Sequence, residues 1–169
     1  LAETYDYIHS KAINPGTWIS LATVTIEPWS VFTTAKVFEQ HPEWFVRDKQ
    51  GNFCNLHNSR PQLRTACMAT GWYDYIKSKM LNLVEPNDLQ YLMVDLAAVA
   101  SAYRYDPSIS GCYATDHPLH KDRRESLLLN YRRIGQLYDE LHQRNPNLFV
   151  DYSFETMGKL QLIDYAMCK

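Results

Sequence analysis

The chain has 169 residues, of which 46% are hydrophobic and 21% are charged, and this composition is typical of a folded globular domain. Its formal net charge is −2 with both signs interspersed, which excludes the basic footprint of a nucleic-acid-binding protein and a polybasic membrane patch. No apolar run is long enough to span a bilayer.

The first twelve residues predict an amphipathic helix, because apolar residues recur at intervals of three or four positions. The N-terminus has neither an initiator methionine nor the basic and apolar regions of a signal peptide. The patterned segment that runs to Lys169 ends without a capping residue. We therefore expect both ends to be cut and the chain to be part of a larger protein.

Asn14-Pro-Gly16 ends this first helix, and the β-forming residues that follow predict a strand over 15–21. Residues 25 to about 65 form a long connection. Within it, His41-Pro-Glu-Trp-Phe-Val46 and the turn Asp48-Lys-Gln-Gly51 indicate a small hairpin or flap.

The rest of the chain alternates helix and strand. Helices are predicted over 68–83 and 122–144, and strands over 90–95 and 147–152. No linker, repeat or low-complexity segment interrupts this pattern, so residues 1–169 form one domain or part of one. We predict that the three strands are parallel and adjacent in chain order, with the two later helices packed outside.

Two of the predicted strands end in carboxylates, Asp95 and Asp151, and the loops after the strands are long and rich in polar and aromatic residues. The connections after the helices are short Pro/Asn turns. In a (β/α)₈ barrel this asymmetry marks the carboxyl ends of the strands as the working face. A doubly wound open sheet would show the same alternation, but no glycine-rich phosphate-binding turn is present.

The four cysteines, Cys54, Cys67, Cys112 and Cys168, form no CxxC pair and have no histidine at the usual ligand spacing. We therefore expect structural thiols and no metal site, with a Cys54–Cys67 disulfide left open. His117 and His120 lie three residues apart in the loop after the strand at 90–95. Such histidines are more often loop hydrogen-bonding groups than metal ligands.

Four motifs follow one another along the chain: Tyr7-Ile-His-Ser-Lys-Ala-Ile-Asn-Pro-Gly-Thr-Trp18, His41-Pro-Glu-Trp44, Tyr91-Leu-Met-Val-Asp95, and the junction from Tyr138 to Phe149. In this order they resemble the melibiase-type α-galactosidases of glycoside hydrolase family 36. The second is similar to the family's "HP(D/E)W" loop and the third falls where the family has "YLKWD". The resemblance spans nearly the whole chain but only the middle of the family's barrel, so it implies about three β/α units of a TIM-type barrel.

The resemblance implies that Asp95 is the catalytic nucleophile, that the general acid/base lies beyond Lys169, and that no cofactor is required. It also implies a carbohydrate substrate bound by Trp18, Asp151, Gly158 and Lys159. Trp29 and Trp44 are alternative sugar-stacking residues, and Glu155 is an alternative acid/base. The chain departs from the family at Met93, where the family has a substrate-binding lysine, and at Ala97-Ala98, which replace Asn-Arg.

The sequence therefore predicts a retaining glycoside hydrolase that acts on α-linked sugars and is similar to an α-galactosidase. The alternatives are a non-catalytic or degenerate carbohydrate-binding barrel and an unrelated βαβ architecture. We also expect the isolated 169-residue segment to fold poorly, because an open part of a barrel leaves sheet edges and interior faces uncovered.

Overall fold

The computed structural model describes residues 2–19, 30–32, 35–57, 60–94, 111–154 and 165–168. Its largest unit is a four-stranded sheet in the order β1 (Gly16–Ile19), β5 (Tyr91–Val94), β6 (Phe149–Phe154) and β7 (Tyr165–Cys168). All neighbouring strands are parallel. The predicted order of the first three strands is confirmed, and β7 adds a fourth strand that the sequence pattern did not predict.

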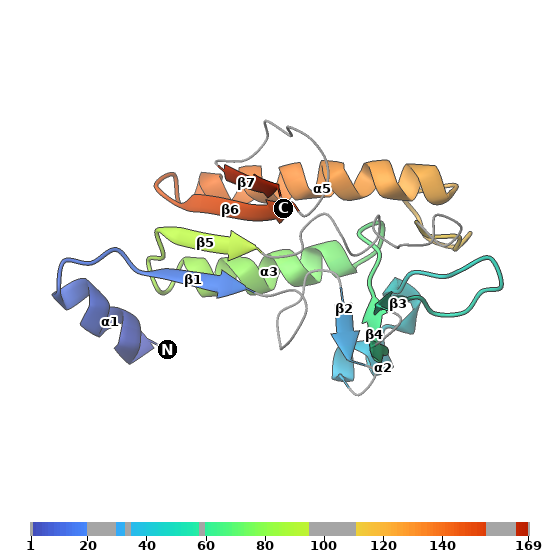
Figure 1. Cartoon of the computed structure of the whole chain (residues 1–169), viewed down its shortest axis with the longest axis horizontal. Coiled ribbons are helices and arrows are strands. Elements are labelled where there is room, and N and C mark those ends of the chain that lie inside the picture. Colours follow the sequence, from blue (N-terminus) through green and yellow to red (C-terminus); the bar gives the residue numbers. More distant parts are fainter. Residues whose placement is uncertain are drawn as a thin grey trace.

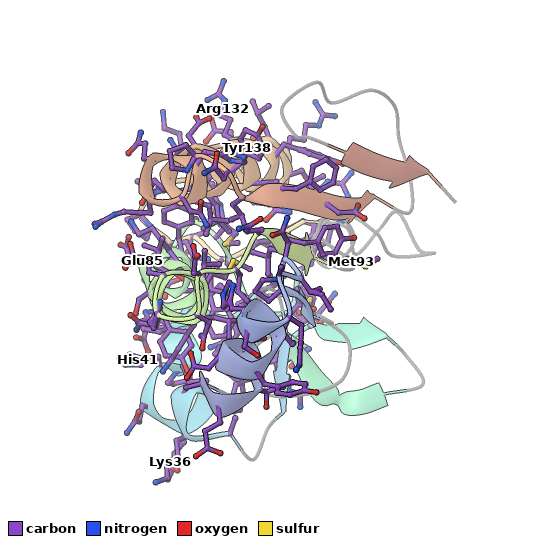
Figure 2. All side chains as sticks on the ribbon, turned by 90° about the vertical axis from the view of Figure 1, so that its left-hand side faces the viewer. Lys36, His41, Glu85, Met93, Arg132 and Tyr138 are labelled. Carbon is purple, nitrogen blue, oxygen red and sulfur yellow. The ribbon has the colours of Figure 1, made fainter. Side chains whose placement is uncertain are left out.

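Two helices cover one face of this sheet, α3 (Trp72–Val84) and α5 (Arg123–Arg144), as Figure 1 shows. Turned by 90°, the molecule shows both helices on one side of the strands and the labelled Met93 on the other (Figure 2). The strand residues Leu92, Val94 and Val150 are at most 1% exposed and belong to the same apolar cluster as the helices. The helices contribute Ile76, Met80, Val84, Ile134, Leu137 and Leu141 to it.

The predicted helix boundaries are close to the observed ones, with one informative difference. We expected the first of these helices to begin at residue 68, but α3 begins at Trp72. The four residues from Cys67 to Thr70 form a turn, in which the Thr70 hydroxyl donates to the Cys67 carbonyl at 2.7 Å and accepts from the Trp72 amide at 3.3 Å. A serine or threonine that bonds nearby backbone in this way favours a turn before a helix over the helix interior.

Short connections at the amino ends of the strands fix their register. The Gln90 amide donates to the Pro15 carbonyl at 3.0 Å, and the Phe149 amide donates to the Gln90 carbonyl at 2.8 Å. Asn145, which ends α5, donates from its side-chain amide to the Leu89 carbonyl at 2.7 Å. These bonds align β1, β5 and β6 side by side, so the carboxyl ends of the three strands lie at the same edge of the sheet.

The long connection between β1 and α3 forms a second, antiparallel sheet in the order β2 (Ser30–Phe32), β4 (Arg60–Thr65) and β3 (Asn55–His57). The predicted turn is confirmed: Gly51 has φ +82° and its amide donates to the Asp48 carbonyl at 3.1 Å. The short helix α2 (Lys36–Gln40) and the 3₁₀ helix η1 (Pro42–Trp44) complete this region. Figure 1 shows the small sheet on the side toward which the arrows of β1 and β5 point.

The N-terminal helix α1 (Ala2–Ser10) matches the prediction, and it places the buried Tyr5 in the apolar cluster under α3. Among the described residues, no helix has the length and apolarity that crossing a membrane requires.

Candidate functional site

Three predicted or family-matched positions share one row across the parallel sheet. Trp18 of β1 pairs in register with Met93 of β5, and Met93 pairs with Asp151 of β6. The chain continues from Val94, the last residue of β5, directly into Asp95. Asp95 itself lies outside the described residues.

Asp151 is buried on the sheet face away from α3 and α5. Its side chain shares that face with Tyr91, whose hydroxyl donates to Asp151 Oδ2 at 2.8 Å. The other carboxylate oxygen, Oδ1, is buried and has no hydrogen-bond partner among the described residues. We expected Asp151 to end its strand, but β6 continues to Phe154, so this carboxylate lies within the sheet face rather than at its rim.

The aromatic rings next to Asp151 form its immediate surroundings. Tyr91 stacks on Phe149 with ring centroids 5.9 Å apart and planes within 8° of parallel. Removal from water, followed by the hydrogen bond to Asp151 and the negative charge of Asp151, raises the pKa of Tyr91 to about 12. The phenol therefore stays protonated near neutral pH and acts as a donor that orients the carboxylate.

Trp44, an alternative stacking residue in the sequence analysis, is used in packing. Its ring lies parallel to the His41 ring at a centroid distance of 3.8 Å, and a Cβ added at Gly71 would lie 2.7 Å from the Trp44 ring. His41 also contacts Glu43, with Nδ1 3.1 Å from Oε1. The motif His41-Pro-Glu-Trp44 therefore builds a turn next to α3, and His41 covers one face of the Trp44 ring.

The remaining predicted site residues have no described side chains. The backbone of Trp18 is part of β1, but its side chain lies outside the described part of the chain. Gly158 and Lys159, together with the alternatives Trp29 and Glu155, also lie outside the described residues. Their roles in the site stay predictions.

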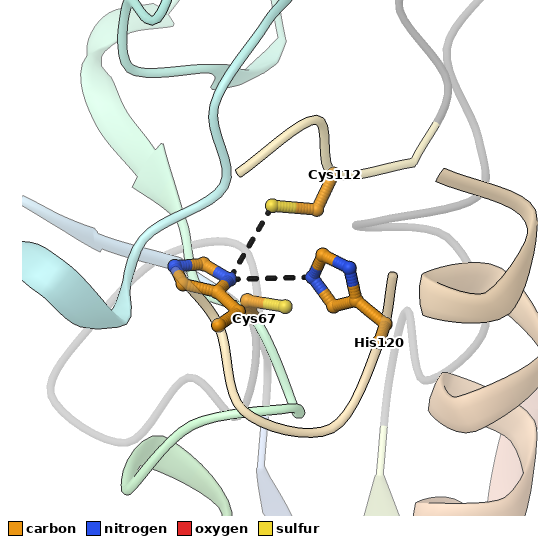
Figure 3. A group of neighbouring side chains, drawn as sticks. Cys67, Cys112 and His120 are labelled. Atoms are coloured by element: carbon orange, nitrogen blue, oxygen red, sulfur yellow. Dashed lines mark hydrogen bonds between the residues drawn. The ribbon is translucent and has the colours of Figure 1, made fainter. Parts of the chain in front are cut away.

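A second group of polar side chains, which the sequence analysis did not bring together, lies where the loops enter α3 and α5. Cys67 precedes α3, whereas Cys112, His117 and His120 precede α5; Figure 3 shows Cys67, Cys112 and His120 converging. One potential ligand atom of each of the four lies within 4.8 Å of those of the others. His117 Nδ1 is 3.5 Å from Cys112 Sγ and 3.3 Å from His120 Nε2.

The two thiols of this group have opposite pKa shifts. Hydrogen bonding to Cys67, aided by His117 and His120, lowers the pKa of Cys112, whereas the Cys112 neighbour and burial raise the pKa of Cys67. Cys54, Cys67 and Cys112 are not in disulfides, so the bond that the sequence left open between Cys54 and Cys67 is not formed. The local sequence signal for the group was the stretch that holds Cys112, His117 and His120, whereas Cys67 is far away along the chain.

Comparison with solved structures identifies α-galactosidases as structural neighbours. The chain is similar to an enzyme of glycoside hydrolase family 36 from Geobacillus stearothermophilus in complex with 1-deoxygalactonojirimycin (16% identity, TM-score 0.69, 99% of this chain and 21% of that chain). It is also similar to the enzyme from Lactobacillus brevis (20% identity, TM-score 0.57, 89% of this chain and 18% of that chain). A third neighbour is the enzyme from Thermus thermophilus in complex with p-nitrophenyl α-D-galactopyranoside (13% identity, TM-score 0.58, 89% of this chain and 26% of that chain). No family model matches the sequence, and no curated protein matches it either.

At these identities the likeness shows a shared fold. The chain spans about a fifth to a quarter of the length of these enzymes. The described residues form a parallel sheet with helices on one face, and they do not by themselves show a closed barrel.

Proposed function

We propose that the chain is part of the catalytic barrel of a retaining glycoside hydrolase that acts on α-linked sugars, with α-galactosides as the first substrate class to test. The observation that carries the proposal is the parallel order β1-β5-β6, in which Asp95 follows the end of β5 directly. Barrel enzymes carry their catalytic groups at the carboxyl ends of their strands.

The fold likeness supports this choice of reaction class. The neighbours are α-galactosidases, and the one from Thermus thermophilus was solved with p-nitrophenyl α-D-galactopyranoside. This likeness covers 89–99% of the chain in the three comparisons above.

In the proposed mechanism, the Asp95 carboxylate attacks the anomeric carbon and forms a glycosyl ester while the bond to the leaving oxygen breaks. A second carboxyl group, on a later strand of the barrel, protonates that oxygen and then removes a proton from the water that hydrolyses the ester. In retaining enzymes the two carboxyl groups lie about 5 Å apart. No cofactor takes part in this scheme.

Asp151 is proposed to bind a substrate hydroxyl rather than to attack the sugar. Tyr91 holds one carboxylate oxygen, whereas the buried Oδ1 has no partner among the described residues. A buried carboxylate oxygen without a partner is costly, and a sugar hydroxyl could donate to it. Trp18, Gly158 and Lys159 are proposed as further substrate contacts on the basis of the family resemblance.

The test uses the full-length protein and a panel of p-nitrophenyl α-glycosides. We expect Asp95→Asn and Asp95→Ala to abolish turnover with the fold retained, and an activated 2-fluoro glycoside to label Asp95, because a retaining enzyme passes through a covalent ester. Glu155→Gln is the matched carboxylate control and should cost far less. Near-normal turnover by Asp95→Asn would refute the nucleophile assignment and make Asp151 the next carboxylate to test.

A second candidate function is carbohydrate binding without hydrolysis. It is favoured by Met93, which stands in the sheet row next to Asp151 at the position where the family has a substrate-binding lysine. If this alternative holds, calorimetry detects binding of α-galactosides or related sugars while no substrate in the panel is turned over. In that case Asp151→Asn weakens binding, and Asp95→Asn leaves it unchanged.

A further inference from the structure

The group formed by Cys67, Cys112, His117 and His120 is almost completely removed from solvent. The exposed fractions are 4%, 1%, 5% and 4%, respectively. It sits beside a small apolar cluster that also contains Val46, Cys54, Ala69 and Ala114, with Leu129 packed against it. Two thiols and two imidazoles in such surroundings have little access to water, so their polar atoms must be satisfied by one another or by a bound ion.

Hydrogen bonds among the four do not satisfy them all. His117 Nδ1 lies within contact of both Cys112 Sγ and His120 Nε2, although one ring nitrogen offers either a proton or a lone pair. The outer ring nitrogens, His117 Nε2 and His120 Nδ1, are buried and have no partner among the described residues, and an ion held by the two inner ring nitrogens does not contact them. Four side chains whose polar atoms converge on one point, without matched hydrogen-bond donors and acceptors, are typical of a metal site.

The distances fit a tetrahedral ion. With Zn–S near 2.3 Å and Zn–N near 2.0–2.1 Å, a regular tetrahedron separates two nitrogens by about 3.3 Å and a sulfur from a nitrogen by about 3.6 Å. The observed separations are 3.3 Å between His120 Nε2 and His117 Nδ1 and 3.5 Å between Cys112 Sγ and His117 Nδ1. Two of the six separations therefore match a tetrahedral ion, and all six are within 4.8 Å.

We propose that Cys67, Cys112, His117 and His120 bind one Zn²⁺ ion as a closed structural site. A set of two thiolates and two imidazoles is typical of zinc, and four protein ligands leave no open position for a substrate. The ion would join the loop that enters α3 to the loop that enters α5. The proposal is independent of the sugar chemistry at Asp95.

The backbone around the site holds the ligands in place. The stretch from Trp44 to Arg47 binds both loops, because the Cys67 amide donates to the Trp44 carbonyl at 2.8 Å and the Tyr113 amide donates to the Arg47 carbonyl at 2.9 Å. The Ser126 hydroxyl accepts from the Cys112 amide at 2.9 Å. Such support from neighbouring hydrogen bonds orients metal ligands before the ion binds.

The expectation of no metal rested on the spacing of cysteines and histidines along the sequence. That test looks for ligand pairs that are close in the chain, and here Cys67 is supplied by a distant loop. His117 and His120, with Cys112 shortly before them, supply the other three ligands. The fold, rather than a local motif, completes the set.

The first measurement is the zinc content of the full-length protein by inductively coupled plasma mass spectrometry. In the second, a chelator removes the metal and Zn²⁺ is titrated into the metal-free protein. We expect one zinc per chain. Cys112→Ala should remove most of it, and Cys54→Ala, a buried cysteine of the same cluster, should leave it unchanged. His120→Cys should retain zinc, because a Cys₃His set also binds zinc tetrahedrally.

Cobalt substitution gives a readout that does not depend on how well the variants fold. In the unmodified protein, Co²⁺ should give the visible absorption of a tetrahedral cobalt thiolate, and Zn²⁺ should displace it. The proposal is overturned if the unmodified protein binds neither metal, if mass spectrometry finds a Cys67–Cys112 disulfide, or if Cys54→Ala loses zinc as completely as Cys112→Ala.

Discussion

The apolar core under the parallel sheet and the Cys/His group before α3 and α5 are stabilised in different ways. In the core, many side chains from α3, α5, β5 and β6 share the burial, so that each contributes a limited part of the total. In the Cys/His group, four side chains converge on one point and each has a specific direction. Shortening a core side chain should therefore weaken the fold in proportion to the volume lost. Shortening a side chain of the Cys/His group should instead remove the proposed zinc binding.

The largest expected effect is in the core. Met80 is fully buried between α3 and the sheet, and Met80→Ala should lower the free energy of unfolding by about 2–5 kcal/mol, because it leaves a cavity. Urea denaturation measures the loss, with the exposed Ser78→Ala on the same helix as the control. Bound zinc per folded chain should stay at the wild-type value. If it falls with stability, the core and the Cys/His group are not separable.

A substitution beside the group should have a smaller effect on stability and a larger one on metal binding. Gly111 has φ +81°, and a Cβ added there would lie 2.5 Å from the Arg123 carbonyl oxygen. Gly111→Ala should cost roughly 2 kcal/mol and should lower the zinc content, because the clash displaces the adjacent Cys112.

Gly51→Ala is the matched control for this strain. Gly51 has φ +82° but no atom lies within 4 Å of an added Cβ, so the variant should show the backbone strain alone and keep its zinc. Equal zinc loss in both variants would contradict the assigned contact between Gly111 and Arg123.

The sheet face away from α3 and α5 supplies the third prediction. Tyr91→Phe removes the hydroxyl that donates to Asp151 and should cost roughly 1–2 kcal/mol near neutral pH, whereas the exposed Tyr7→Phe should cost almost nothing. A tyrosine pKa raised in the folded state means that its contribution is complete below pH 10 and is lost as the pH rises toward about 12. The difference in stability between wild type and Tyr91→Phe should therefore shrink over this interval, and a constant difference would contradict the assigned role.

The smallest effect is expected at the start of α5. The Asp122 carboxylate accepts from the Arg124 and Glu125 amides at 2.7 and 2.9 Å, and these bonds lower the pKa of Asp122. Asp122→Ala should slightly lower the midpoint of thermal unfolding because it removes this helix cap, and Asp139→Ala on the exposed side of the same helix is the control. Because α5 begins directly after the His120 loop, an Asp122→Ala variant that also loses zinc would show that the helix start helps to position the ligands.

The sequence by itself determined the helices and strands that alternate along this chain. Apolar residues at helical spacing predicted α1, α3 and α5, and short apolar runs bounded by Pro and Asn turns predicted β1, β5 and β6 in their observed order. These features depend on neighbours a few positions away, so a single chain is enough to reveal them. The same local reasoning predicted the turn at Asp48–Gly51 but missed the strand β4, which forms only by pairing with β2 and β3.

Only the tertiary structure decided which polar side chains meet. Tyr91 and Asp151 are 60 positions apart, yet the in-register pairing of β5 and β6 brings the hydroxyl to the carboxylate. Cys67 joins Cys112 only because both loops bind the stretch from Trp44 to Arg47. Contacts of this kind depend on how distant strands and loops pack. The spacing of apolar residues along the sequence carries no information about that packing.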